Sequence, residues 1–166
     1  MRGVRYVVVA SAVMFFASLA GAAPASAMPP THETLPPIQV PGVIECRSFQ
    51  DNFVDFYSGT QTTFYDSNGE AVQIVQHTEH HSNDVNSVTG LTIHEHGHFT
   101  FTIDLTTGTV TITGNQEVAN RPGLGVVVQD VGRTVFDMDG NLVFFAGGRN
   151  HSGLFGGDQV WCDALS

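Results

Sequence analysis

The chain contains no lysine, and its six basic residues are all arginine. Two of them lie within the first five residues, so the sequence after residue 27 has four arginines against 16 acidic residues and a formal charge of −12. Such a surface has little with which to neutralise phosphate groups. We therefore exclude nucleic acid and anionic lipid as partners of the mature chain.

Cysteine is equally scarce, with only Cys46 and Cys162 in the chain. They do not form a CxxC pair, which argues against a reactive thiol pair. An even number of cysteines in an exported chain favours a disulfide. A bond between them would close a loop of about 117 residues and, in the chain-entropy treatment, stabilise the fold by roughly 4–5 kcal/mol.

Long hydrophobic runs are absent beyond the first segment, where "YVVVASAVMFFASLAG" follows Arg2 and Arg5. The run is followed by Ala25-Ser26-Ala27, a small-residue cleavage signal. This order predicts a signal peptide over 1–27, a secreted protein and a mature chain that begins at Met28. The alternative, a membrane anchor, is disfavoured because the run is short and ends in small residues and prolines.

Five prolines crowd the next stretch, "MPPTHETLPPIQVPG", over 28–42. Proline lacks the backbone N–H that a ladder or a helix interior requires. We expect a flexible, extended tether over 28–42, followed by one folded domain over 43–166.

The folded part has no convincing helical pattern. Short β-branched and aromatic segments alternate with turn signals such as Asn68-Gly69 and Asp139-Gly140. Segments 63–72 and 134–143 resemble each other, which we interpret as shared hairpin-turn chemistry rather than duplication. With a disulfide joining the first and last strands, the sequence predicts an all-β fold, a single antiparallel barrel of about eight strands.

One motif suggests zinc chemistry: "LTIHEHGHFTFTID" over 91–104 fits the H-E-x-x-H pattern of zinc proteases. That pattern works on a helix, but apolar and polar residues alternate here with a period of two, which indicates a half-buried strand. On a strand, His94 and His98 stand about 13 Å apart. Phe101 also occupies the place where the longer zinc-protease motif has glycine. We therefore predict no zinc protease.

A strand leaves another use for these histidines. His94, His96 and His98 would project from one face, with neighbours about 6.8 Å apart, and such a pair can chelate zinc, copper or nickel weakly. In the preceding "HTEHH", His77 and His81 share a face with Glu79, while His80 points the other way, and the register between the strands stays open. A solvated polar face and a pH-sensing cluster are the alternatives.

Glu95 is the one charged residue on the otherwise apolar face of its strand. A buried carboxyl favours its protonated form and could act as an acid or a base, which makes Glu95 the single, weak catalytic candidate. Beside Gly97, a residue typical of a bulge, Glu95 could instead reach solvent.

Several short elements look familiar together: Cys46 after the signal segment, "VTGLT", "GLGVVVQDVGRTVFDMDGNLV" and a terminal "WCDAL". From about Cys46 to Leu165 the chain resembles a group of small exported proteins of high-GC Gram-positive bacteria. That resemblance implies no established activity, and the histidine-rich strands are not part of the group pattern. At fold level it resembles allene-oxide-cyclase-like and dirigent-like barrels, which bind apolar or phenolic molecules inside.

Two classes of function follow. The first is a binding module for a small apolar ligand inside the barrel, or a surface-interaction protein if side chains fill the interior. The second is a cyclase- or isomerase-like enzyme with polar groups in its lumen. A histidine-rich metal-binding protein is a further alternative. We favour a non-enzyme without an obligatory cofactor, and the oligomeric state stays open.

Overall fold

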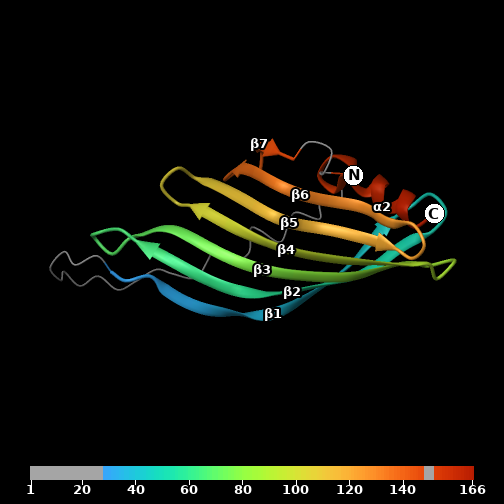
Figure 1. The fold of residues 1–166 in the computed structure, drawn as a ribbon, viewed down its shortest axis with the longest axis horizontal. Coiled ribbons are helices and arrows are strands. Elements are labelled where there is room, and N and C mark those ends of the chain that lie inside the picture. Colours follow the sequence, from blue (N-terminus) through green and yellow to red (C-terminus); the bar gives the residue numbers. More distant parts are fainter. Residues whose placement is uncertain (1–27, 148–151) are drawn as a thin grey trace.

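The computed structural model describes residues 28–147 and 152–166, and the predicted signal peptide lies outside them. The described chain forms one antiparallel sheet and two short helices (Figure 1). The strands are β1 (Thr31–Glu45), β2 (Gln50–Tyr65), β3 (Ala71–Asn86), β4 (Thr92–Asp104), β5 (Thr109–Arg121), β6 (Gly125–Asp137) and β7 (Leu142–Ala146), and the helices are α1 (Ser152–Gly156) and α2 (Asp158–Ala164). The predicted all-β, antiparallel class is confirmed.

The ladders join strands that are consecutive in sequence, in a single row of seven from β1 to β7. The expected number of about eight is therefore slightly too high. None of the ladders between the described strands joins β1 to β7, so closure of the row into a barrel stays a prediction. No helix of the described residues combines the length and the apolar character needed to cross a bilayer.

The proline-rich segment is not a free tether, so this prediction is wrong for most of 28–42. Residues from Thr31 onward form β1 and pair with β2. The prolines are tolerated because β1 stands at the end of the row. On one side of this strand, backbone N–H groups are not needed for a ladder. Pro36 and Pro37 fall in a register shift between Leu35 and Ile38, where pairing is interrupted.

The C-terminal segment is a second correction, because Cys162 was expected to lie in the last strand and lies in helix α2 instead. A short apolar run cannot be assigned to strand or helix by its period alone. The helix brings Trp161, Cys162 and Ala164 into the protein interior, and Leu165 follows at its end.

The predicted disulfide is confirmed. Cys46, between β1 and β2, is bonded to Cys162 in α2 with an S–S distance of 1.95 Å. It fastens the last helix to the first hairpin.

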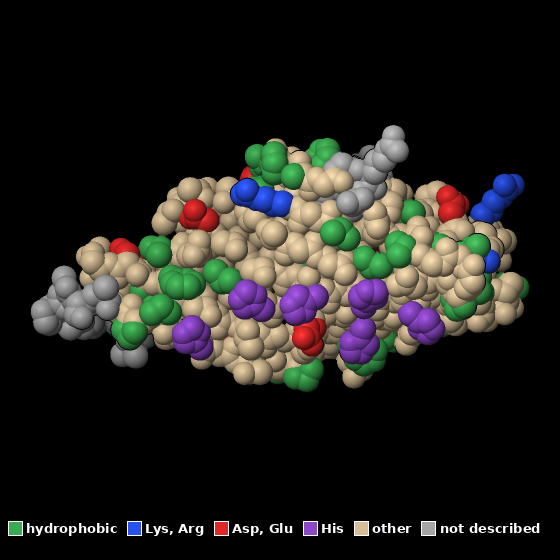
Figure 2. Space-filling model, in the orientation of Figure 1, with side chains coloured by type: hydrophobic (Ala, Val, Ile, Leu, Met, Phe, Trp, Pro, Cys, Tyr) green, Lys and Arg blue, Asp and Glu red, His purple; other side chains and the backbone are tan. Residues whose placement is uncertain are grey.

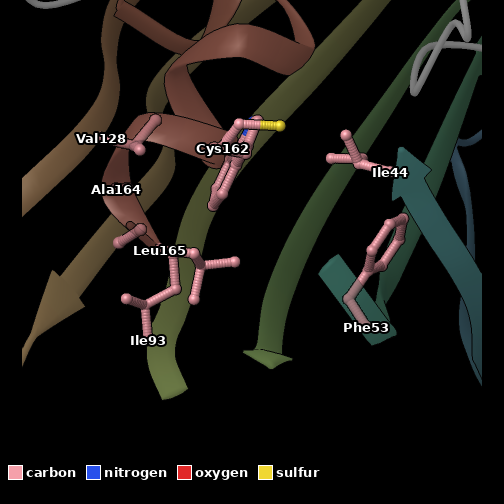
Figure 3. Close-up of a cluster of buried hydrophobic side chains, with 9 residues drawn as sticks. Ile44, Phe53, Ile93, Val128, Cys162, Ala164 and Leu165 are labelled. Atoms are coloured by element: carbon pink, nitrogen blue, oxygen red, sulfur yellow. The ribbon is translucent and has the colours of Figure 1, made fainter. Parts of the chain in front are cut away.

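One face of the sheet, here the inner face, carries the buried side chains in two apolar clusters. The first surrounds α2 and includes Leu165 beside Ile93, with Ile44 and Phe53 on the other side of the cluster (Figure 3). The second joins β4 and β5 and contains Phe99, Ile103, Val110 and Ile112. A polar stretch of the inner face lies between them along β4.

Three hairpin turns share one device. Asp104 and Asp137 are the last residues of β4 and β6, and Asp66 directly follows β2. Each carboxylate accepts backbone N–H groups from the turn that follows. These hydrogen bonds lower the pKa of each carboxyl. The resemblance between 63–72 and 134–143 is therefore explained by turn chemistry, as predicted.

Candidate metal centre

The segment that carries the histidine motif forms strand β4 (Thr92–Asp104), as predicted. In β4, His94, His96 and His98 are exposed, while Ile93 and Phe99 are buried on the opposite face. This alternation excludes the helical geometry that a zinc protease needs from H-E-x-x-H.

The register between β3 and β4, which the sequence left open, pairs His81 with His96 and Glu79 with His98. These side chains lie on the outer face, where Figure 2 shows histidines gathered across the middle of the molecule. On that face, His94, His96 and His98 do not bring three potential ligand atoms together around one point. In the described part of the chain, one group of three potential ligands lies within 4.8 Å of one another, and it is on the inner face: Asp55, His80 and Glu95.

Three neighbouring strands supply this inner group, one residue each. Asp55 on β2 and Glu95 on β4 both lie opposite Ser82 of β3, in the same row across the sheet. His80 lies two residues before Ser82, in the adjacent row, between Tyr57 and Gly97. Its ring is thus diagonal to both carboxylates.

Both ring nitrogens of His80 face a carboxylate. Nε2 lies 3.5 Å from Oδ1 of Asp55, and Nδ1 lies 3.4 Å from Oε1 of Glu95. Both distances are longer than the usual hydrogen bond of about 2.9 Å. Among the described atoms, neither Asp55 Oδ1 nor His80 Nε2 has a hydrogen-bond partner.

Tyr57 holds one side of the group. Its ring stacks on the His80 ring with centroids 4.5 Å apart and planes 13° apart. Its hydroxyl donates a long hydrogen bond of 3.5 Å to Oδ2 of Asp55. The imidazole is therefore fixed in orientation, while one oxygen of Asp55 stays available.

A backbone contact closes the site on the other side. A Cβ on Gly97 would lie 2.3 Å from the carbonyl oxygen of Gln116. The register of β4 and β5 shifts at this point, so β5 bulges toward Gly97. Only glycine admits this approach next to His80.

Burial makes the charges of the group costly. Asp55, His80 and Glu95 are only 8 %, 6 % and 3 % exposed. Other buried acids of the inner face are Asp51, Asp84 and Asp130. A buried carboxylate requires a compensating cation, strong hydrogen bonds or a proton.

The arginines in the described segments lie elsewhere. The Arg121 guanidinium donates to the carbonyl oxygens of Ala164 and Ser166. Arg133 lies over the Phe144 ring, and Arg47 is exposed. Of the residues named above, His80 lies within 3.5 Å of a carboxylate oxygen of both Asp55 and Glu95.

The sequence found part of this site. It placed Glu95 on the face opposite to the histidine triplet and His80 on the face opposite to His77 and His81, but it left open which faces of the two strands coincide. Of the two alternatives for Glu95, the structure shows burial rather than contact with solvent. Asp55 was missed. Its signal was the alternation of Asp51, Phe53, Asp55 and Tyr57 on one face of β2, but only the register brings Asp55 to His80.

Two hollows of the described surface lie outside the sheet interior. The larger, of about 400 Å³, lies over β1, β2 and β3 and is lined in part by Leu35, Gly59 and His77. The smaller is formed by β1 and β2 around His32 and Thr60. Neither is the expected lumen for an apolar ligand.

Comparison of the chain with protein-family models, curated proteins and solved structures gives no match, so its family is not assigned by similarity.

Proposed function

We propose that the protein binds a divalent metal ion, best fitted by Zn²⁺, through Asp55, His80 and Glu95. The observation that carries the proposal is the convergence of these three buried donors within 4.8 Å. Imidazole nitrogen and carboxylate oxygen are both zinc ligands, and three protein ligands leave one position open.

The spacing of the donors supports an ion better than direct hydrogen bonds. Ligand atoms at about 2.1 Å from a tetrahedral ion stand roughly 3.4 Å from one another. The 3.5 Å between Asp55 Oδ1 and His80 Nε2 matches that separation. Glu95 faces the other ring nitrogen of His80, so its side chain would have to turn toward the ion to become the third ligand.

Charge supports the same conclusion. A divalent cation bound between Asp55 and Glu95 would offset the charge of these buried carboxylates. The alternative is an imidazolium at His80 between the two carboxylates. The experiment below separates these two states.

A proton-transfer enzyme of the cyclase or isomerase kind is the second candidate. The 3.4 Å approach of Glu95 Oε1 to His80 Nδ1 favours it, because a carboxylate that orients an imidazole is a frequent acid–base pair. A small apolar ligand is less well supported, since the middle of the inner face presents carboxylates and an imidazole rather than apolar side chains. We also propose that the protein acts outside the cytoplasm, which the predicted signal peptide and the Cys46–Cys162 disulfide support.

The test is the metal content of the full mature protein, measured by plasma mass spectrometry after dialysis, followed by zinc titration against a chromophoric chelator. We expect one tightly bound zinc ion per chain. Asp55→Asn and Glu95→Gln keep the shape of the side chain and should each weaken zinc binding at least about tenfold. His32→Gln is the control, since His32 is an exposed histidine on β1 that does not belong to the buried group.

Thermal unfolding with and without zinc completes the test. Zinc should raise the melting temperature of the wild type and of His32→Gln by more than that of the two carboxylate variants. If wild-type protein gains no stability from zinc, manganese or iron, and Glu95→Gln changes stability equally in chelator and in metal, His80 is an imidazolium and the proposal is wrong.

A further inference from the structure

The outer face carries a second set of donors that the buried site does not use. Two adjacent rows of the ladder between β3 and β4 place Glu79 opposite His98 and His81 opposite His96. Directly opposite side chains of an antiparallel pair have Cβ atoms about 5 Å apart, and neighbours two residues along one strand are about 6.8 Å apart. The four side chains therefore form a compact square, called here the outer square.

The corners of the outer square are free to approach an ion. His98 Nδ1 and Glu79 Oε1 already lie 3.9 Å apart, and their side chains are 75 % and 72 % exposed. The His81 ring stacks on Phe56 with centroids 4.8 Å apart and planes 3° apart, which holds it above the sheet. Three imidazoles and one carboxylate thus stand side by side on the exposed face, and rotation of these exposed side chains would bring their donor atoms to one ion.

The histidines on either side of the square are engaged with other residues. His94 Nδ1 lies 2.6 Å from Oδ1 of Asn83, and His77 Nδ1 lies 3.0 Å from Oγ1 of Thr100. These contacts use one nitrogen of each ring for a neighbour across the ladder. The side chains of the outer square are therefore better candidates for a shared ion than His77 and His94.

We propose that the outer square is a separate, exposed site for a borderline transition-metal ion, with Cu²⁺ bound more tightly than Ni²⁺ or Zn²⁺. Imidazole suits all three ions, and the preference for copper follows from the general order of affinities of divalent metals. The sequence suggested His94, His96 and His98 along one strand. The register instead selects a set across two strands, which keeps His96 and His98, adds His81 and Glu79, and omits His94.

The outer square is independent of the buried centre because consecutive residues of a strand point to opposite faces. His80 and His81 belong to different sites for this reason, as do Glu95 and His96. The larger surface hollow borders the outer square at Glu79 and His98, which leaves room for water or a small anion to complete the coordination of an ion there.

The experiment is a calorimetric titration of the mature protein with Ni²⁺ and a spectroscopic titration with Cu²⁺, performed in the Glu95→Gln background and in the wild type. We expect Ni²⁺ binding in both proteins with the same affinity. His81→Gln/His96→Gln should weaken it at least about tenfold and abolish the copper–imidazole signal in electron paramagnetic resonance.

His32→Gln/His77→Gln is the matched control, because it removes two exposed histidines outside the outer square. Both double variants replace surface residues, and an unchanged melting temperature confirms that each is folded. The proposal is overturned if the His81/His96 variant binds nickel as tightly as the wild type, or if the control loses as much affinity. Loss of nickel binding in Glu95→Gln alone would assign the ion to the buried centre instead, which also overturns it.

Discussion

The carbonyl oxygen of Gln116 occupies the space where a Cβ on Gly97 would lie, at 2.3 Å from that position. This contact locks the bulge of β5 against β4 beside His80. It therefore links the backbone geometry of two strands to the shape of the buried site.

Gly97→Ala should destabilise the protein by about 1–3 kcal/mol, because the added methyl group must displace backbone rather than a flexible side chain. Chemical denaturation monitored by Trp161 fluorescence measures the change. Gly90→Ala is the control: Gly90 has φ 71° and open space around it, so only the conformational penalty of about 1 kcal/mol applies. Equal losses in the two variants would contradict the contact argument.

Leu165→Ala should lower the free energy of unfolding by about 2–4 kcal/mol, because it leaves a cavity in the apolar cluster under α2. Leu165 is fully buried although it is the penultimate residue. Leu142→Ala in β7 is a matched control, since Leu142 is 37 % exposed and its truncation should change stability by well under half as much. A small effect at Leu165 would mean that the end of the chain is not packed in solution.

Reduction of the Cys46–Cys162 bond should destabilise the fold by up to about 4–5 kcal/mol, because it releases a very long loop in the unfolded state. Urea unfolding with and without reductant measures this difference. The double variant Cys46→Ala/Cys162→Ala should behave like the reduced wild type and should not respond to reductant. Free thiols in protein purified without reductant would show that the bond is absent in the native state.

The turn aspartates predict a specific loss of stability in acid. Hydrogen bonds from the Thr106 hydroxyl and the Thr107 backbone hold the pKa of Asp104 at about 2, below its ordinary value of 3.8. Since the folded state favours the carboxylate, this contribution is complete above pH 3.8 and is lost as the pH falls toward about 2. Asp104→Asn should be less stable than the wild type at neutral pH, and the difference should shrink across this window. Urea unfolding at several pH values measures it, and a constant difference would refute the assignment.

The parts of the fold that could be predicted from the sequence depend on local signals. The period of two in 91–104 predicted β4 and the two faces of its side chains, and Asp-Gly and Asn-Gly predicted hairpin turns. The prolines of 28–42 misled because the sequence does not say that β1 stands at the end of the row, where a missing N–H is tolerated. The segment that forms α2 was predicted wrongly as a strand, because its apolar residues are too few to define a period.

The site was harder to predict than the fold because it depends on register. Sequence alternation put Glu95 opposite to the histidine triplet on one strand and His80 opposite to His77 and His81 on another. Their common face, their contact and the position of Asp55 next to them require the pairing of three strands. The same pairing replaces the candidate metal site of His94, His96 and His98 along one strand by the outer square, which spans β3 and β4. Register is fixed by the whole ladder and its bulges, which no short motif encodes.

The arrangement of the disulfide has a consequence for the order of folding. Every ladder joins strands that are neighbours in sequence, so the sheet can grow from local hairpins at a modest entropic cost of loop closure. The bond joins residues 116 positions apart, and its two Cα atoms are brought to 5.5 Å by the docking of α2 under the sheet. Oxidation is therefore expected as a late event, which records that the hairpins and the last helix have already met.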